Sequence, residues 1–545
     1  MGRHPTVPRA LTLVFVVFAV LLAVVACETG DGDPTPPPAE DTEPDTGPPE
    51  DEEPADPAEQ ARAHPEFRED DDCFGRDRPP GGDDGPASIV CGYVSSPLHH
   101  AEPDGPTVEL AVVTYEGRAS AEHDRPLVVL GGGPGEAMVE PFLAEPSFRE
   151  LFDIGPDLIV VDQRGVGASE PALECPQVFD DPEQGLTPQQ EADAFIEELL
   201  GCRERLAEDG IDLGAFNHLA NAADVDVVRR ALGHDEIDVR GTSYGSQVAL
   251  LAAQMRPETI GAVVLSSPVD PTRNWVELAP AGIQQALREV ADACERDAGC
   301  SDAFGDVDEL VDATVARLDD EPEEVEVDLP DIEATTLTYT PAQFLGGLSL
   351  LFYVPDGVAV VPAFAAAAAD GDLSPVAELT VTLEQQIAGA LSVGMQYSML
   401  CTGEGGLVTE QGLRAATDDG PIEEYWIPDN IIAGDRLGEL CDEWGVPVVY
   451  DPDEITLDHD VPTLIVTGEF DHVTPPELGE SVARQLDDHV LIEVPAAGHG
   501  PLEALGPCGA QIAGGFLLDP TTAPDDTCAT SREIAFVGGP AASGP

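Results

Sequence analysis

A serine between two glycines is the first residue in this sequence that could perform covalent chemistry. The motif Gly241-Thr242-Ser243-Tyr244-Gly245 follows a run that reads as a strand and precedes one that reads as a helix. In a tight turn of this kind the serine is held in a strained backbone conformation, and larger residues at the glycine positions would collide. Ser243 is therefore predicted to be an exposed nucleophile rather than an ordinary turn serine.

A serine hydroxyl needs a base to take its proton, and the base needs a carboxylate to orient it. His499 is the candidate base, because it follows an apolar run and has small neighbours in Ala497-Gly498-His499-Gly500-Pro501. Asp471 is the candidate acid, since it follows another strand-like run and the glycine Gly468. The adjacent His472 is the nearest rival base.

A glycine-rich segment could hold the negative charge that develops during attack by the serine. Gly131-Gly132-Gly133-Pro134-Gly135 follows a third apolar run. Backbone amides that approach the substrate oxygen stabilise the tetrahedral intermediate by about 3 kcal/mol per donor. The predicted donors are the amides of Tyr244 and of Gly132 or Gly133. A Walker-type phosphate loop is excluded because the sequence contains no lysine.

The strands that must position these residues are short runs that are mostly apolar throughout. They alternate with helical patterns over residues 221–232 and 246–255, which favours a doubly wound, mostly parallel α/β sheet covered on both faces. Such a sheet binds ligands at the carboxyl ends of its strands, where the candidate residues stand. The predicted strands are 108–115, 126–130, 157–162, 236–240, 261–266, 462–467 and 490–494.

The interval between Ser243 and Asp471 is longer than two strands and their helices require. Residues 271–455 are therefore predicted to be a mainly helical insertion between strands 6 and 7. Residues 73–270 and 456–545 would form the two parts of the core. Helices are expected at 281–297, 307–318, 342–353 and 360–369, with an acidic break at 321–328.

Taken together, these motifs resemble the α/β-hydrolases of the prolyl iminopeptidase and tripeptidyl aminopeptidase family, in its secreted lipoprotein branch. The order Ser243, Asp471, His499 is that of the α/β-hydrolase fold. Asp162-Gln163-Arg164-Gly165 and the paired cysteines near the C-terminus add to the resemblance, which covers roughly residues 73–540. Many members have His or Asn-Pro ahead of the Gly-Gly-Pro-Gly core, whereas Leu130-Gly131 stands here.

The resemblance implies a fold, a cap and an activity. In that family the insertion is a cap that limits substrates to peptide N-termini, and the loop at 162–165 buttresses the active site. We interpret Asp162 and Arg164 as structural residues that bond backbone near the oxyanion loop. The expected activity is that of a serine aminopeptidase that releases one to three N-terminal residues through an acyl-enzyme.

An aminopeptidase without a metal must hold the substrate ammonium with carboxylates. Glu404 in the insertion is the candidate, among many acidic residues there. The expected partners are peptides with a free N-terminus, and no cofactor is expected. We also expect a monomer. Two alternatives stay open: a carboxylesterase of the same fold, because the serine motif is shared with such enzymes, and an inactive lipid-anchored peptide-binding protein.

The N-terminus is typical of an exported lipoprotein. Arg3 and Arg9 precede an apolar stretch, and small residues lead to Cys27, as in the bacterial lipobox whose thiol receives a diacylglyceryl group. The stretch falls short of the ~20 residues that span a bilayer. Residues 1–27 are thus predicted to be the signal peptide and 28–72 a disordered acidic, Pro-rich tether. The protein would lie outside the cytoplasm, touching the cell membrane through this anchor only.

The sequence contains eleven cysteines. Without Cys27 an even number remains, which favours disulfides in an oxidising compartment. No Cys-x-x-Cys spacing occurs, so no metal site is expected. The favoured pairs are sequence neighbours: Cys73–Cys91, Cys175–Cys202, Cys294–Cys300, Cys401–Cys441 and Cys508–Cys528.

The net charge is extreme, with 106 acidic and 24 basic residues giving −82. Such a chain cannot neutralise nucleic-acid phosphates, so nucleic-acid binding is not expected. A folded domain this acidic repels itself unless counter-ions screen it, which indicates a high-salt habitat. A GC-rich genome would also account for the use of arginine alone. We expect the melting temperature to rise with NaCl concentration, whereas a flat melting temperature would contradict salt adaptation.

Overall fold

The fold was determined as a computed structural model that describes residues 65–76, 89–118, 123–179, 188–330, 334–417 and 419–537. The predicted signal peptide, the lipidation site Cys27 and most of the tether lie outside these residues. Pro65 to Pro545 belong to one compact unit. None of the helices in the described ranges is both long and apolar enough to cross a bilayer.

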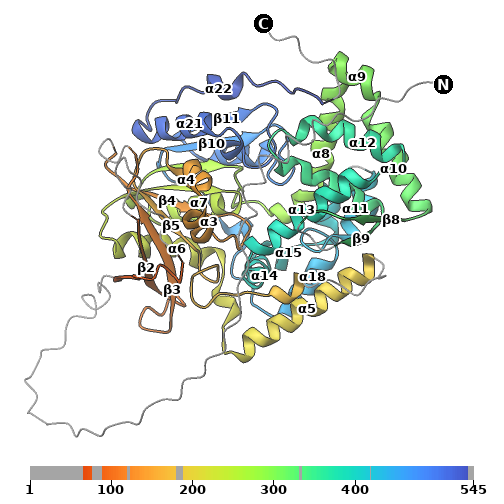
Figure 1. Cartoon of the computed structure of the whole chain (residues 1–545). Coiled ribbons are helices and arrows are strands. Elements are labelled where there is room, and N and C mark those ends of the chain that lie inside the picture. Colours follow the sequence, from red (N-terminus) through yellow and green to blue (C-terminus); the bar gives the residue numbers. More distant parts are fainter. Residues whose placement is uncertain are drawn as a thin grey trace, which may run out of the picture. The chain divides into compact units, whose positions relative to one another are not determined.

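The described residues form a mostly parallel sheet of nine strands in the order β1-β2-β3-β5-β4-β6-β7-β10-β11 (Figure 1). The strands from β5 to β11 in this order pair in parallel, whereas β1, β2 and β3 form an antiparallel group that joins β5. Their bounds are β1 Phe67–Glu69, β2 Ile89–Pro97, β3 Thr107–Tyr115, β4 Leu127–Leu130, β5 Leu158–Val161, β6 Ile237–Thr242, β7 Ile260–Ser266, β10 Thr463–Gly468 and β11 His489–Val494.

The predicted α/β class and mostly parallel sheet are confirmed, but the antiparallel edge was not foreseen. β3 is a nearly continuous apolar run, and such a run does not reveal strand direction. β1 also lies inside the stretch that was assigned to the tether, so folded structure begins before Cys73. Its backbone pairs with β2, and the Arg68 guanidinium lies over the Tyr93 ring.

Helices cover both faces of the sheet, which explains the continuous apolar strands. Along β4, Val128 and Leu130 belong to one core cluster, and Leu127 and Val129 belong to the other. The first cluster includes side chains of α6 and α7, and the second those of α3, α4 and α21. Their bounds are α3 Val139–Ala144, α4 Pro146–Phe152, α6 His218–Ala231, α7 Tyr244–Met255, α19 Pro476–Gln485, α20 Pro501–Ala504, α21 Pro507–Leu518 and α22 Thr527–Thr530.

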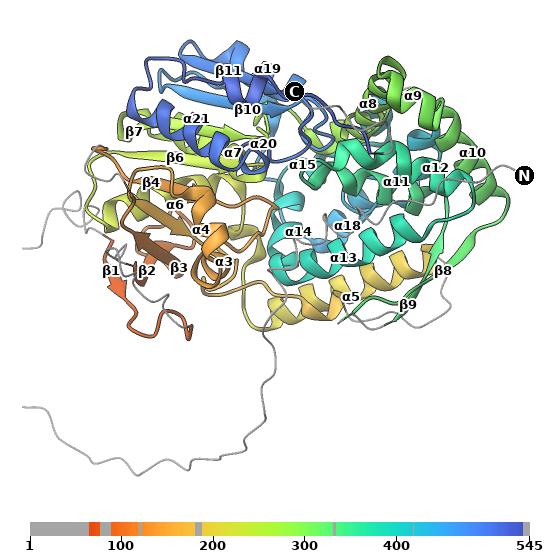
Figure 2. The same ribbon diagram turned by 45° about the horizontal axis from the view of Figure 1, so that its top comes forward.

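A group of mainly helical elements stands between β7 and β10 in the sequence. Figures 1 and 2 show them gathered on one side of the sheet. The longer ones are α8 Trp275–Arg296, α10 Val307–Asp320, α13 Ser374–Ala390 and α14 Val393–Thr402. The shorter ones are α9 Ala298–Phe304, α11 Pro341–Ser349, α12 Val361–Ala369, α15 Glu404–Leu407, α16 Glu410–Ala415, α17 Ile427–Asp429 and α18 Arg436–Trp444.

Two other segments join these helices. Helix α5 (Pro188–Glu208) precedes β6 in the sequence, yet it packs against α14 and α18, as Figures 1 and 2 both show. Arg203 Nε on α5 donates to the Trp444 carbonyl at 3.0 Å. Near the C-terminus, the Val537 amide donates to the Ala359 carbonyl. The helical layer therefore also takes residues from the segments that were assigned to the core.

One expectation within the insertion was wrong. The predicted acidic break at 321–328 contains strand β8 (Glu323–Val327), which pairs antiparallel with β9 (Thr335–Tyr339). Val325 and Val327 alternate with glutamates in β8, and this period of two is a strand pattern that the acidic composition concealed.

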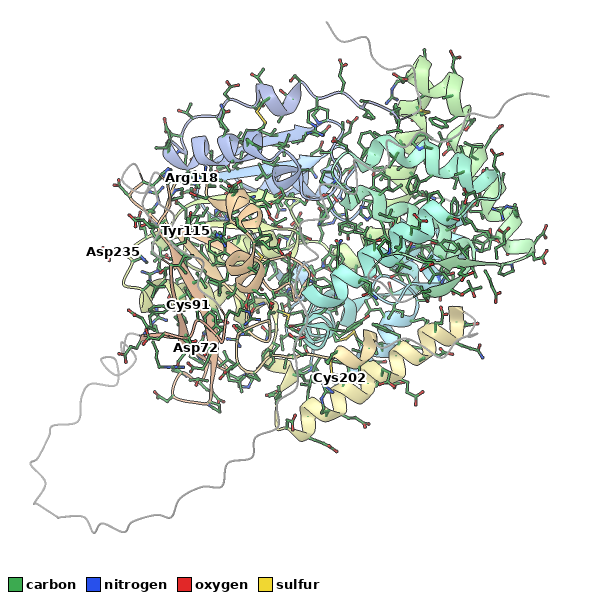
Figure 3. The ribbon with its side chains drawn as sticks, in the orientation of Figure 1. Asp72, Cys91, Tyr115, Arg118, Cys202 and Asp235 are labelled. Carbon is green, nitrogen blue, oxygen red and sulfur yellow. A yellow bond between two sulfur atoms is a disulfide. The ribbon has the colours of Figure 1, made fainter. Side chains whose placement is uncertain are left out.

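Disulfides join ten cysteines in the same five pairs that sequence neighbourhood favoured. Figure 3 labels Cys91 on β2 and Cys202 on α5. Cys91 links β2 to the segment that follows β1, and Cys202 links α5 to the chain after β5. Both bonds thus fasten a loop segment to a neighbouring strand or helix.

Candidate active site

Ser243 occupies the turn between β6 and α7. Its backbone has φ 54° and ψ −125°, a conformation that residues other than glycine rarely adopt. Its amide donates to the Ser266 carbonyl at 3.0 Å. A Cβ on Gly241 would lie 2.1 Å from the Gly245 carbonyl oxygen, and one on Gly245 would lie 2.5 Å from that of Leu130. Glycine is therefore required at both positions, and the turn presents a half-buried serine.

Asp471 and His499 come from the loops after β10 and β11, and their side chains are in contact. His499 Nδ1 lies 2.9 Å and 3.0 Å from the two carboxylate oxygens. Asp471 also accepts hydrogen bonds from the hydroxyls of Ser267 at 2.6 Å and Thr474 at 2.8 Å, and from the Thr474 amide. Its carboxylate is thus fixed in orientation before any substrate arrives.

Electrostatics within this pair favour an ionised acid and a basic imidazole. Burial opposes the charge of Asp471, but His499 and the donors around it outweigh burial and hold the Asp471 pKa at about 2. Burial likewise opposes the His499 cation, yet the Asp471 carboxylate raises the His499 pKa above its ordinary value. This is the arrangement that a general base requires.

His472 does not share this setting. It is buried against the rings of Phe352 and Tyr353, and burial lowers its pKa to about 3. An enclosed imidazole with a low pKa is a weak base, so the structure favours His499 over His472 as the base.

Ser243 Oγ and His499 do not form a hydrogen bond in the described part of the chain. Catalytic hydrogen bonds are often long or poorly aligned in enzymes without substrate and tighten when the substrate binds. Ser243 follows β6 and His499 follows β11. These two strands belong to one sheet, in which β7 and β10 lie between them.

The glycine loop after β4 lies against Ser243. A Cβ on Gly132 would be 3.2 Å from the Ser243 Cβ, so glycine allows the loop to approach. Gly133 and Gly135 have positive φ values of 96° and 100°. The Gly132 amide donates to a carboxylate oxygen of Glu136 at 2.6 Å. Glu136 was not singled out by the sequence analysis. The one signal that could have distinguished it from the other acidic residues is its position directly after the glycine loop.

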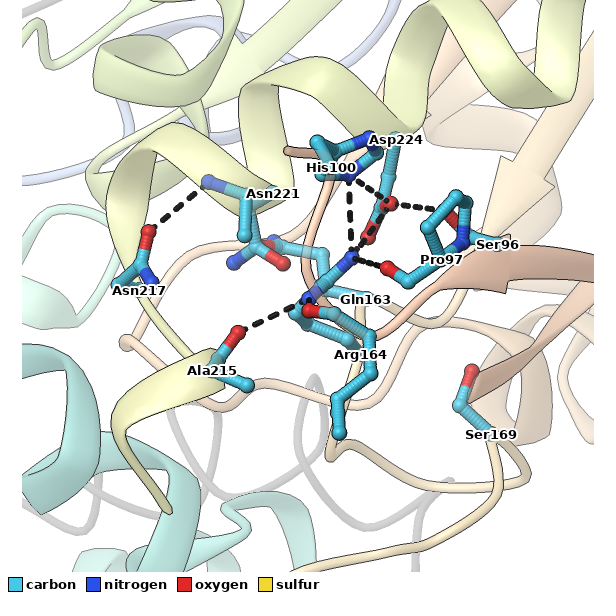
Figure 4. Close-up of polar contacts among 12 residues, drawn as sticks. Ser96, Pro97, His100, Gln163, Arg164, Ser169, Ala215, Asn217, Asn221 and Asp224 are labelled. Carbon is cyan, nitrogen blue, oxygen red and sulfur yellow. Dashed lines mark hydrogen bonds and ion pairs between the residues drawn. The ribbon is translucent and has the colours of Figure 1, made fainter. Parts of the chain in front are cut away.

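Asp162 and Arg164 act differently from each other. Asp162 accepts hydrogen bonds from the amides of Met138 and Val139 at 2.7 and 2.9 Å, so it holds the start of α3 directly after the glycine loop. Arg164 also bonds backbone, as expected of a structural residue, but its hydrogen bonds go to other segments than the glycine loop, which corrects the expected location. Figure 4 shows the fully buried Arg164 paired with Asp224 and bonded to the carbonyls of Pro97 and Ala215.

Glu404 lies in a buried polar cluster beside α7. Its carboxylate is 2.9 Å from His218 Nε2 and accepts a hydrogen bond from Gln247 Nε2 at 2.7 Å. The carboxylate therefore already has polar neighbours within the protein, and its side chain is fully buried. Binding of a substrate amine by Glu404 stays a prediction.

A second carboxylate that the sequence analysis did not single out, that of Glu503, connects the strands beside the site by hydrogen bonds. Glu503 on α20, just after His499, accepts hydrogen bonds from Arg240 and Thr242 of β6 at 2.7 and 2.8 Å and from Ser266 of β7 at 2.7 Å. It thereby ties the chain after His499 to β6, the strand that directly precedes Ser243. No local pattern distinguishes this glutamate from the other acidic residues.

Fold and site together define a serine hydrolase. A family model for the alpha/beta hydrolase fold matches residues 125–303, and one for TAP-like protein matches residues 432–528. The chain belongs to the α/β-hydrolase family, and the resemblance drawn from its motifs is confirmed.

Three curated relatives illustrate the similarity. Serine protease Hip1 of Mycobacterium tuberculosis is 26% identical over 74% of this chain and 81% of its own length. Tripeptidyl aminopeptidase of Streptomyces coelicolor is 31% identical over 35% of this chain and 37% of its own length. Carboxylesterase B of Mycobacterium tuberculosis is 29% identical over 38% and 42%, respectively.

The raised His499 pKa predicts the pH dependence of hydrolysis. His499 must be neutral to accept the serine proton, so kcat/KM should fall as the pH drops through a pKa above 6.5, the ordinary value for histidine. A pH series of kcat/KM in the free enzyme measures this limb. An acid limb well below pH 6.5 would contradict the pairing with Asp471.

Proposed function

We propose that the chain is an exported serine aminopeptidase that cleaves one to three residues from the N-terminus of peptides. The observation that carries this proposal is the buried Asp471–His499 pair at the sheet edge that also presents Ser243. The names of the relatives Hip1 and tripeptidyl aminopeptidase support a peptide bond as the target.

Each step of the proposed reaction falls to a named group. Ser243 Oγ attacks the scissile carbonyl carbon while its proton moves to His499 Nε2, and Asp471 stabilises the resulting imidazolium. The amides of Tyr244 and Gly132 hold the oxyanion. Collapse of the intermediate breaks the C–N bond, and His499 gives the proton to the leaving amine. Water then attacks the acyl-enzyme by the same route and frees Ser243.

The helices between β7 and β10 are proposed to form a cap that admits peptide ends. Backbone contacts support this role, because the Ser392 amide donates to the Gly135 carbonyl and the Ala137 amide donates to the Ala390 carbonyl. The chain between α13 and α14 therefore adjoins the oxyanion loop. Lids in this position exclude water and select substrates by size.

Two features support export. The N-terminus resembles a lipobox, and the five disulfides are of a kind that persists in oxidising compartments. The lipid would be attached at Cys27. Radiolabelled glycerol or fatty acid should be incorporated in cells expressing the full chain and lost in Cys27→Ala. Labelling of both proteins, or of neither, would contradict the anchor.

Parallel assays separate the proposed activity from its rivals. The substrates are peptide anilides with a free amine, the same anilides with a blocked amine, and short acyl esters. Turnover of the free-amine anilides above the blocked ones supports the aminopeptidase. Ester turnover alone would establish the carboxylesterase, which the name of one relative favours, and absence of any turnover would favour the inactive binding protein.

A further inference from the structure

The carboxyl group of Glu136 occupies a position that the reaction needs. The Gly132 amide, one of the two proposed oxyanion donors, already donates to Glu136 Oε2 at 2.6 Å. Both this oxygen and the Ser243 Cβ lie 3.2 Å from the point where a Cβ on Gly132 would stand. They are therefore within about twice that distance of each other. The resting enzyme thus carries its own acceptor in the oxyanion hole.

The surroundings compensate a negative charge on Glu136 only in part. Within the described ranges no side chain donates to its carboxyl group; the Gly132 amide does. Burial and the neighbouring Glu503 raise its pKa, while His499 acts in the opposite direction. A carboxylate in such a place is stabilised by any cation that comes within contact distance.

We propose that Glu136 binds the α-ammonium of the residue whose carbonyl is attacked, and that this contact releases the Gly132 amide for the oxyanion. The inference rests on the proposed function and narrows it. A substrate oxygen must displace Glu136 from the amide. When the substrate carries an α-ammonium the displaced carboxylate gains a new partner, and when it carries none the carboxylate is left unpaired.

Covalent geometry sets the range of this contact. In an amino acid the α-nitrogen lies only about 3 Å from the carbonyl oxygen of the same residue, because three short bonds join them. Each further residue moves the ammonium away by up to about 3.5 Å. Glu136 can therefore reach the amine of a single residue that is being released, but not that of a tripeptide in an extended conformation. The enzyme should release one residue at a time.

The chain between α13 and α14, part of the proposed cap, lies beside Glu136. The backbones of Glu136 and Leu391 form an antiparallel bridge, and a Cβ on Gly133 would lie 3.2 Å from Leu391 Cδ2. An extended peptide running from Ser243 past Glu136 would meet this bridge. The enclosure agrees with a site that ends after one residue.

The test compares Glu136→Ala and Glu136→Gln with the wild-type full chain on three substrates: an aminoacyl anilide, a tripeptidyl anilide and a nitrophenyl acyl ester without an amine. We expect kcat/KM for the aminoacyl anilide to fall at least about tenfold in both variants, since a charged hydrogen bond is lost. The ester rate should rise several-fold in Glu136→Ala, because the Gly132 amide is freed. The wild type should prefer the aminoacyl to the tripeptidyl anilide.

A matched control variant keeps the result interpretable. Glu140→Gln changes an exposed glutamate four positions along the same segment and should behave as the wild type. Equal losses on all three substrates, or wild-type behaviour of the Glu136 variants, would overturn the role of Glu136. If the wild type cleaves the ester and neither anilide, the proposed function fails instead. Preference for the tripeptidyl anilide would overturn release of single residues.

Discussion

Replacing Ser243 with alanine is expected to lower kcat/KM by a factor on the order of 10⁶, because removal of a triad nucleophile leaves only the oxyanion donors and binding contacts. Folding should survive. Alanine keeps the Ser243 carbonyl, which accepts a hydrogen bond from the Ser246 hydroxyl, and it tolerates the positive φ no worse than serine. The measurement is steady-state hydrolysis, with thermal unfolding of the same preparations.

Ser95→Ala is the matched control for this variant. It removes a hydroxyl from an exposed position on β2, on the antiparallel part of the sheet. Activity should stay near that of the wild type. A Ser243→Ala enzyme that is folded and retains more than a small fraction of its activity would show that another group attacks the substrate.

Asp471→Asn is expected to lower kcat by a factor on the order of 10⁴, the loss that follows when the imidazole is held in the wrong tautomer. In the wild type both carboxylate oxygens accept, and His499 Nδ1 is therefore a donor. An asparagine amide can instead donate to Nδ1, which places the imidazole proton on Nε2. His499 then cannot take the proton of Ser243.

The pH profile distinguishes this mechanism from simple damage to the fold. Since the Asp471 carboxylate raises the His499 pKa, its loss should move the acid limb of the remaining activity to lower pH. Asp487→Asn, an exposed aspartate between α19 and β11, serves as the control and should leave the profile unchanged. A residual activity with an unshifted limb would contradict the assigned coupling.

The sequence allowed prediction of features that follow from local patterns. The glycines at 241 and 245 indicate the turn around Ser243. The strands β4, β6 and β10 are bounded by residue types that commonly end strands. His499 could be recognised because small neighbours follow a strand. In each case the information lies within about ten residues, which is the range over which pattern reasoning works.

Features that depend on distant partners could not be predicted in this way. The direction of β3 is set by β2 and β5, and the partners of Arg164 come from chain segments that only the tertiary fold assembles. Glu136 and Glu503 are two glutamates in a chain with 106 acidic residues. Their positions next to Gly132 and Arg240 distinguish them, and no sequence pattern encodes those contacts.

The most direct measurement is the reaction of the full chain with a fluorophosphonate probe, followed by mass spectrometry of the labelled peptide. An activated serine hydrolase forms a stable adduct at its nucleophile. We predict one adduct, on Ser243, that is absent in Ser243→Ala and forms far more slowly in His499→Ala. An adduct on a different residue, or none on a folded wild-type protein, would contradict the triad of Ser243, His499 and Asp471.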